Sequence, residues 1–320
     1  MICRREASGI RVRLIAYEGV ECGPSCIASP VSPVASSEPH ILVLPSPFLS
    51  DTDTIRLLEP ADADTQWLLR QVRSGEYDKP FILDDGTTRS LHFSLSLIQS
   101  TMSLKDPFAL ALDYTQAMMS FLLFCQHPRE ILMLGLGGGS LAKFCYRHVG
   151  SARIAVVEID PGVIAFRDEF QVPPDDDRLT IVEGDGAEWV RPQRERDARP
   201  DIILMDAFDR HGLAGSVSSF GFYQNVFDTL SGRGVMVANL AGHKDNRETH
   251  LSMIGEVFDD RVLTIRLPDG NDIVLAFRQP GFAPRWREIG NLAKALRART
   301  GMDFPRFAQR LERSRRLRYL

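Results

Sequence analysis

Between residues 131 and 239, short apolar strands alternate with helical segments, and this alternation constrains the fold more than any other feature. The expected strands are apolar at every position rather than at every second one, as in ILMLG and IAVVE. Strands buried on both faces form a parallel sheet that helices cover on both sides. We therefore predict an α/β fold with a doubly wound, Rossmann-like sheet. Its expected strands are 131–135, 154–158, 179–182, 202–205 and 235–239, its expected helices are 140–148, 161–170 and 218–230, and a closing strand pair is expected at 262–267 and 273–277.

The segments on either side of this alternation predict three further parts. Short strands and a hairpin turn at 84–86 predict a small β-rich N-terminal domain, and a helix is expected over 107–124. The run from 23 to 47 holds six prolines and shows no sustained apolar period. We expect a disordered leader (1–48), the β-rich domain (49–105), the Rossmann-like domain (106–280) and a helical tail (281–320).

The tail is basic. Residues 285–320 hold eleven Lys and Arg residues against three Asp and Glu, and their apolar residues follow helical spacing. A basic amphipathic helix can dock on nucleic acid or another anionic surface. It can equally cover the rest of the protein with its apolar face and leave a solvated basic face outside.

Composition excludes several classes of protein. The net charge of −4 argues against a general nucleic-acid binder, which needs a basic excess. No segment reaches the roughly 18 apolar residues of a membrane span, and arginines interrupt the N-terminal region where a signal peptide would be apolar. The cysteines lack a second pair at ligand spacing, so no metal site is expected. We expect a cytoplasmic protein with no membrane partner.

A glycine-rich turn and an acid mark the expected nucleoside site. Gly135, Gly137, Gly138 and Gly139 stand between the first buried strand and its helix, where glycine allows a tight turn and a close approach to a ligand. Glu158 ends the next strand, where a carboxylate can accept both hydroxyl groups of a ribose. Together these two features favour a nucleoside such as S-adenosylmethionine or its decarboxylated form.

Further acids follow the next two strands. Asp185, in the triplet that ends at Gly186, can accept from the amino group of adenine, although such a triplet also forms simple turns. Asp206 and Asp209 follow the strand IILM, at the sheet edge where open α/β sheets bind ligands. These two carboxylates could hold a cationic amine, and one of them could take up its proton. Asp209 could instead cap a helix or face solvent.

These motifs, in this order, resemble the spermidine synthase family of polyamine aminopropyltransferases, a branch of the class I methyltransferase-like fold. The matches are ILMLGLGGGSL, the triplets EID and GDG, and the loop DAFD, and the likeness covers roughly residues 80–280. The resemblance implies that Glu158 and Ile159 bind the ribose side of the nucleoside, that Asp185 binds adenine, and that Asp206 is the catalytic acid/base. It also implies substrate contacts from Asp209, Gln99, Tyr114 and Tyr223, and a homodimer formed through the N-terminal domain.

Three positions depart from the family pattern. The aspartate that grips the aminopropyl amine in the family falls on Gly138, and a polar partner beside Tyr114 is replaced by Thr115. The loop proline after the second aspartate is replaced by Arg210-His211. The nucleoside pocket therefore matches the family, whereas the amine pocket is altered. Gly138 would leave room for the carboxylate of intact S-adenosylmethionine.

We predict a transferase that moves an aminopropyl group from decarboxylated S-adenosylmethionine to a small amine such as putrescine. The nucleoside acts as a co-substrate, and no tightly bound cofactor is expected. A methyltransferase that uses S-adenosylmethionine is the first alternative. A non-catalytic nucleoside-binding protein is the second, although it has no need for Asp206.

Overall fold

The centre of the protein is a seven-stranded mixed sheet with the strand order β13–β14–β12–β9–β6–β7–β8. The computed structural model describes residues 40–48, 53–95, 97–191, 199–209, 212–213 and 215–317. β12, β9, β6, β7 and β8 are parallel, whereas β14 pairs antiparallel with both β12 and β13. The strands are β6 (Glu130–Leu134), β7 (Arg153–Glu158), β8 (Leu179–Glu183), β9 (Ile202–Met205), β12 (Val235–Leu240), β13 (Val262–Arg266) and β14 (Asp272–Phe277).

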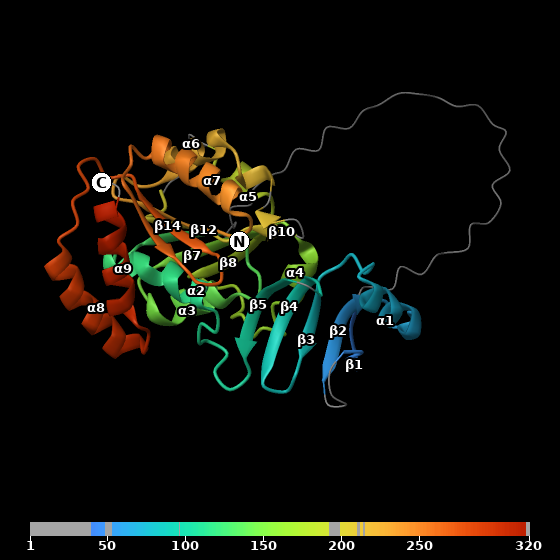
Figure 1. Ribbon diagram of the computed structural model, residues 1–320. Coiled ribbons are helices and arrows are strands. Elements are labelled where there is room, and N and C mark those ends of the chain that lie inside the picture. The colour runs from blue at the N-terminus through green and yellow to red at the C-terminus, as the bar shows by residue number, and fades with distance from the viewer. Residues whose placement is uncertain are drawn as a thin grey trace, which may run out of the picture. The chain divides into compact units, whose positions relative to one another are not determined.

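Helices cover both faces of this sheet, as the alternation predicts (Figure 1). Along β6, Ile131 and Met133 point into one apolar core, and Leu132 and Leu134 point into a second. The first core is shared with α2 (Asp113–Met118), η1 (Met119–Leu123), α3 (Ser140–His148), α4 (Pro161–Ala165), α8 (Trp286–Thr300) and α9 (Phe304–Leu317). The second is shared with α6 (Phe220–Thr229) and α7 (Lys244–Val257) and lies beside α5 (Gly186–Trp189) and η2 (Gly215–Val217). The prediction of a doubly wound, methyltransferase-type sheet is confirmed.

Two helices are shorter than predicted. α2 begins at Asp113 rather than near residue 107. α4 ends at Ala165, and the chain continues in turns that bury Phe166 and Phe170 beside α3. Turns that bury these two rings take the place of the last part of the helix predicted over 161–170.

A second, antiparallel sheet precedes the central one. Its strands lie in chain order, and α1 (Thr65–Ser74) shares a separate apolar core with them. They are β1 (His40–Pro45), β2 (Thr54–Glu59), β3 (Phe81–Asp84), β4 (Thr88–Ser94) and β5 (Leu97–Ser103). This confirms the predicted β-rich N-terminal part. Whether it is a separate domain ending at residue 105 stays a prediction, since residues from Glu38 onward form one compact unit.

The leader predicted over 1–48 is wrong in its last part, because β1 lies within it. β1 pairs with β2 along its whole length, from His40 opposite Glu59 to Pro45 opposite Thr54. Edge strands tolerate proline, which has no N–H to donate, so the proline-rich composition did not exclude a strand here. The predicted leader up to residue 39 lies outside the described residues.

The basic tail packs on the central sheet. Ile289, Ala293 and Leu296 of α8 are buried, as are Phe304 and Leu311 of α9. All five belong to the core on one face of the sheet. The tail is therefore a helical cover, and this packing favours that reading over a docking module. No helix in the described part of the chain is long and apolar enough to cross a membrane.

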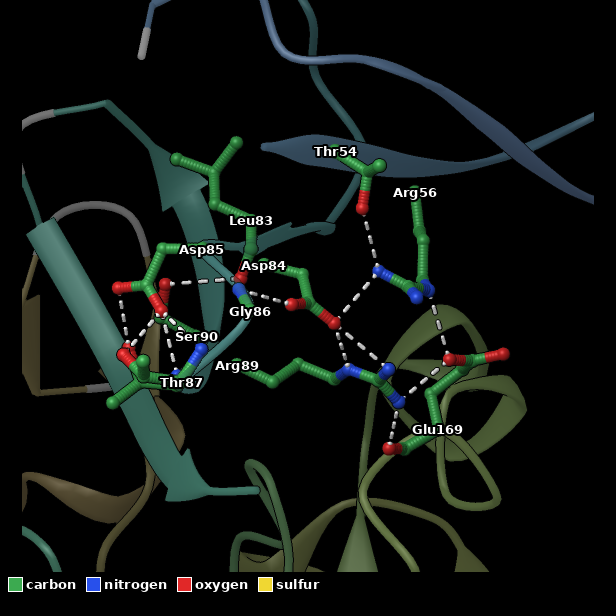
Figure 2. Close-up of polar contacts among 11 residues, drawn as sticks. Thr54, Arg56, Leu83, Asp84, Asp85, Gly86, Thr87, Arg89, Ser90 and Glu169 are labelled. Carbon is green, nitrogen blue, oxygen red and sulfur yellow. Dashed lines mark hydrogen bonds and ion pairs between the residues drawn. The ribbon is translucent and has the colours of Figure 1, made fainter. Parts of the chain in front are cut away.

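Four charged side chains join the first sheet to the loop after α4 (Figure 2). Arg56 on β2 and Arg89 on β4 each contact Asp84 on β3, at 3.1 and 2.8 Å. The same two arginines contact Glu169, at 3.0 and 2.8 Å. Each arginine side chain is only 14% exposed. Because positive and negative groups alternate around the cluster, every charge is paired.

A buried lysine makes a second connection to this loop. The Nζ atom of Lys143, on α3, donates to the carbonyl of Phe170 at 2.6 Å and lies 3.2 Å from the sulfur of Met102 on β5. Burial lowers the pKa of Lys143 to about 8. The loop after α4 is thus held from the first sheet and from α3.

The ends of β6 and β9 approach each other very closely. A Cβ atom at Gly135 would lie 2.3 Å from the carbonyl oxygen of Asp206, and the φ of Gly135 is +96°. Both facts require glycine, because a side chain would collide with the backbone and would strain in this conformation. The position of Asp206 therefore depends on Gly135.

We predict that Asp84→Asn destabilises the protein by about 2–4 kcal/mol, because two poorly exposed guanidinium groups lose a partner. Burial raises the pKa of Asp84, but the Gly86 N–H and the two arginines outweigh it and leave that pKa below its ordinary value. The carboxylate therefore stabilises the fold above about pH 4, and the benefit is lost as the pH falls through the folded-state pKa. Urea unfolding at pH 7 and at pH 3 measures both effects, and the gap between the two proteins should narrow in acid.

Glu188→Gln is the matched control, because its partner Arg191 is 65% exposed and such pairs contribute under about 1 kcal/mol. Equal losses from Asp84→Asn and Glu188→Gln would contradict the structural role of the cluster.

We also predict that Gly135→Ala lowers the melting temperature and weakens ligand binding, because the new methyl group must displace Asp206. Gly150→Ala is the control, since a Cβ atom there meets nothing within 4 Å. Thermal unfolding of both variants measures the difference. Similar melting temperatures would mean that the ends of β6 and β9 can move apart without loss of thermal stability.

Candidate active site

A cavity of about 550 Å³ lies at the carboxyl edge of the central sheet. It sits where β6 and β9 meet, which is where the order of the parallel strands reverses and where open α/β sheets bind ligands. The first sheet supplies part of its wall through Leu91, Phe93, Ile98, Gln99 and Ser100. The cavity is therefore built by both sheets.

The glycine-rich turn forms one side of the cavity. Gly135 and Gly137 line it, whereas Gly138 and Gly139 do not. A Cβ atom on Gly138 would lie 2.8 Å from the hydroxyl of Ser100 and 2.9 Å from the ring of Phe170. The space that Gly138 was expected to leave for a carboxylate is thus already filled. The hydroxyls of Ser100 and Ser140, 3.5 Å apart, reach the cavity instead.

Glu158 is held rigidly at the end of β7. One carboxylate oxygen accepts from the N–H of Leu136 at 2.8 Å, and the other accepts from the N–H of Asp160 at 2.9 Å. Burial raises the pKa of Glu158, and these backbone donors only partly offset that rise. The side chain and its exposed neighbour Ile159 both line the cavity. Each carboxylate oxygen can accept a second hydrogen bond, so the group can still receive ribose hydroxyls.

Asp185 has a structural role and also reaches the cavity. Its side chain caps α5 by accepting from the N–H of Ala187 at 2.8 Å. Asp185 and Gly186 also line the cavity, and β8, which precedes them, pairs with β7, which ends at Glu158. The two alternatives for this triplet, a turn or a ligand contact, are therefore compatible. Its contact with adenine stays a prediction.

Asp206 lies at the carboxyl end of β9, between two polar side chains. Asn239 on β12 donates to its Oδ1 atom at 2.9 Å, and the Tyr114 hydroxyl is also within hydrogen-bonding reach. Burial raises the pKa of Asp206 to about 6, and the two hydrogen bonds oppose that rise. The single O–H proton of Tyr114 can go to Asp206 or to the backbone carbonyl of Gln99, which lies 3.3 Å from the hydroxyl oxygen. A carboxylate with a pKa near neutrality can act as a general base.

Two predicted substrate contacts are not placed at the cavity. Tyr223 is fully buried in the core beneath α6 and α7, and its hydroxyl lies 3.1 Å from Nδ1 of His250. It is not among the residues that line the cavity, because its ring faces the core side of α6, so the structure does not bring Tyr223 together with the other predicted site residues. Asp209 lies in β10 (Phe208–Asp209), which pairs with β11 (Gly212–Leu213). The side chain of Asp209, like Arg210-His211, lies outside the described residues.

Sequence reasoning missed several polar cavity residues, among them Asn239 and Asp269. Asn239 is the only polar residue in the buried strand VMVANL, which was a signal in itself. Its Nδ2 atom bonds Asp206, but within the described structure its buried Oδ1 atom has no partner. Asp269 stands in the β13–β14 turn, which antiparallel pairing returns to the carboxyl edge of β12. Neither position belongs to the motifs that the sequence displays.

The charged side chains that line the cavity, within the described part of the chain, are all negative. Four carboxylates line it, those of Glu158, Asp185, Asp206 and Asp269. No Lys, Arg or His side chain lines it within the described part of the chain. Nor do the described residues contain a group of three or more His, Cys, Asp or Glu side chains that could hold a metal ion. A cleft of one sign concentrates ligands of the opposite sign, so the cavity suits a cationic ligand.

The comparisons with known proteins agree with these motifs. The family model described as the spermine/spermidine synthase domain matches residues 112–259. A polyamine aminopropyltransferase of Chromobacterium violaceum is 38% identical over 237 residues, which cover 73% of this chain and 89% of the relative.

Two solved structures share the fold. A probable spermidine synthase from Corynebacterium glutamicum has a TM-score of 0.58 at 20% identity, over 69% of this chain and 86% of the other. Human methyltransferase-like protein 13, solved in complex with SAH, has a TM-score of 0.52 at 23% identity, over 64% and 93%. With the extensive identity to the bacterial relative, these findings show that the chain belongs to the spermine/spermidine synthase family and is a transferase of the polyamine aminopropyltransferase type.

Proposed function

We propose that the protein transfers an aminopropyl group from decarboxylated S-adenosylmethionine to a small amine, with putrescine as the first acceptor to test. The observation that carries this proposal is the charge of the cavity, which is lined by four carboxylates and by no basic side chain among the described residues. Decarboxylated S-adenosylmethionine carries a sulfonium and an ammonium group, and both suit such a cavity. A buried carboxylate on the ligand would lack a cationic partner there.

The positions of the four acids support assigning different parts of the cavity to different parts of the ligand. Glu158 and Asp185 follow neighbouring strands, β7 and β8, and we assign them to the ribose and the adenine. Asp206 follows β9 and stands beside the glycine-rich turn, where the sulfonium would lie. Asp209, Gln99 and Tyr114 remain candidates for contacts with the amine. A homodimer formed through the first sheet is also part of this proposal.

The chemistry needs one proton acceptor. An ammonium group has no lone pair, so the acceptor amine must lose a proton before it attacks. Ionised Asp206 takes that proton. The amine nitrogen then forms a bond to the aminopropyl carbon as the carbon–sulfur bond breaks, and methylthioadenosine leaves with the electron pair. The sulfonium is already a good leaving group, so the protein mainly positions and desolvates the amine.

One observation favours a second function, methyl transfer from intact S-adenosylmethionine. The family aspartate that would grip the aminopropyl amine is absent, and the atoms nearest to a Cβ at Gly138 are neutral, the hydroxyl of Ser100 and the ring of Phe170. A site without that aspartate places no negative charge against the carboxylate of the intact donor. The two functions differ in the donor that they use and in the nucleoside that they release.

Calorimetric titration with each donor distinguishes the two functions. We expect decarboxylated S-adenosylmethionine to bind at least about tenfold more tightly than the intact form, which is about 1.4 kcal/mol. Addition of putrescine should then release methylthioadenosine, detected by mass spectrometry. Tighter binding of the intact form, with no methylthioadenosine from any polyamine, would contradict aminopropyl transfer and favour the methyltransferase.

Asp206→Asn should lower turnover by about 10²–10⁴-fold, because it removes the general base. Donor affinity should be retained, which calorimetry can check. In the unaltered protein, activity should fall as the pH drops through about 6, since the pKa of Asp206 is raised to about 6 and only the ionised form accepts the proton.

Asn239→Leu should raise the pH below which activity falls. The Asn239 amide donates to Asp206 and lowers its pKa, so its removal raises that pKa further. The measurement is the pH profile of kcat/KM. An unchanged profile with lower activity throughout would mean that Asn239 only packs the strand.

A further inference from the structure

The loop after α4 supports the glycine-rich turn from outside the cavity. A Cβ atom at Gly138 would lie 2.9 Å from the ring of Phe170, and one at Gly139 would collide with a methyl group of Val172. Neither of these two side chains lines the cavity, whereas Gly137, which adjoins the two packed glycines, does. The loop therefore determines where this part of the turn lies.

The turn in its place holds an acid of the proposed nucleoside site. Gly135, Leu136 and Gly137 form part of the cavity wall. The N–H of Leu136 also donates to the carboxylate of Glu158 at 2.8 Å. A shift of the turn would therefore change the shape of the cavity and remove one of the donors that orient Glu158.

Two cations hold the main chain of the loop. Figure 2 shows the guanidinium of Arg89 at both the carbonyl and the carboxylate of Glu169. The ammonium of Lys143 bonds the next carbonyl, that of Phe170, at 2.6 Å. The backbone N–H of Lys143 donates to the carbonyl of Gly139 at 2.8 Å. Lys143 therefore contacts the loop through its side chain and the turn through its backbone.

Packing alone does not account for a lysine at this position. Lys143 is only 1% exposed. Within the described part of the chain its ammonium contacts the carbonyl of Phe170 and the sulfur of Met102, and no carboxylate. Burial of a cation without a counter-charge costs free energy that an apolar side chain would not cost. What the ammonium adds is a strong hydrogen bond that fixes the loop.

We propose that Lys143 is a positioning residue for the donor nucleoside and acts through Phe170 on the glycine-rich turn. The ammonium holds the carbonyl of Phe170, the ring of Phe170 holds Gly138 in place, and the turn keeps Glu158 oriented. Neither Lys143 nor Phe170 lines the cavity, so neither touches the donor. The identity of the donor in this proposal rests on the proposed aminopropyl transfer.

Lys143→Met tests the role of the ammonium, because methionine is of similar length but uncharged. The Kd of decarboxylated S-adenosylmethionine, measured by calorimetry, should rise about tenfold or more, as expected for the loss of a hydrogen bond from a charged group. In assays the KM for the donor should rise with it, whereas kcat and the KM for putrescine should change by less than about twofold. The melting temperature should change little, because loss of the hydrogen bond is offset by removal of a buried charge.

Lys294→Met is the matched control. Lys294 is an exposed lysine on α8 and does not line the cavity. Its replacement should change neither the Kd of the donor nor either KM. A loss of donor affinity in this variant as large as that in Lys143→Met would overturn the assignment of Lys143.

A double-mutant cycle tests whether Lys143 acts through Phe170. Phe170→Leu removes the ring that packs against Gly138 and leaves the backbone carbonyl in place, so it should also raise the Kd of the donor. If both residues act on the turn by one route, the double variant should bind about as weakly as the weaker single variant. Independent effects would instead multiply, and that result would overturn the proposal.

The outcomes separate this proposal from the proposed function. If the unaltered protein binds no decarboxylated S-adenosylmethionine and transfers no aminopropyl group, the proposed function fails and the assignment of Lys143 falls with it. If the unaltered protein is active and Lys143→Met binds the donor equally well, only the assignment is overturned. An equal rise of both KM values would overturn it too, because that indicates general damage to the site. Unchanged donor affinity in Phe170→Leu is a further contrary result, and it does not depend on whether Lys143→Met folds.

Discussion

The candidate site depends on the close approach of two strand ends, β6 and β9. Gly135 has no side chain, so the backbone of Asp206 can lie against it. The register then places Asp206 beside Asn239, because Met205 pairs with Ala238 one residue earlier. The hydrogen bond between these two side chains follows from that register rather than from any local motif. One glycine thus sets the position of the carboxylate, the orientation of its oxygens and, through burial, its affinity for a proton.

The first sheet is part of the site and not an appendage. Gln99 and Ser100 come from β5, and Leu91 and Phe93 come from β4, yet all four line the same cavity as the central sheet. The charged cluster around Glu169 and the buried Lys143 hold the loop after α4 between the two sheets. Phe170 in that loop in turn packs against Gly138. Contacts outside the cavity therefore decide how the glycine-rich turn is positioned.

Patterns within one segment predicted most of the fold and part of the site. Fully apolar strands, the glycine-rich turn and the acids after β7, β8 and β9 lie in continuous sequence, and their positions follow from the rule that parallel strands end at one edge. The direction of a side chain depends on remote neighbours, and the sequence does not display those. Gly138 faces Ser100 and Phe170, and Tyr223 faces the core, for this reason. Asp269 reaches the cavity only through the antiparallel return of β14.

The packing of α9 has a consequence for how the protein is made. Phe304, Phe307 and Leu311, near the end of the chain, fill the core on one face of the central sheet. The described residues that line the cavity all precede residue 272 in the chain. During synthesis the described cavity residues therefore precede α8 and α9, which complete the core that α2, η1, α3 and α4 form on one face of the sheet. Until α9 packs, apolar side chains of that core stay exposed, and exposed apolar surface makes a folding intermediate prone to aggregate.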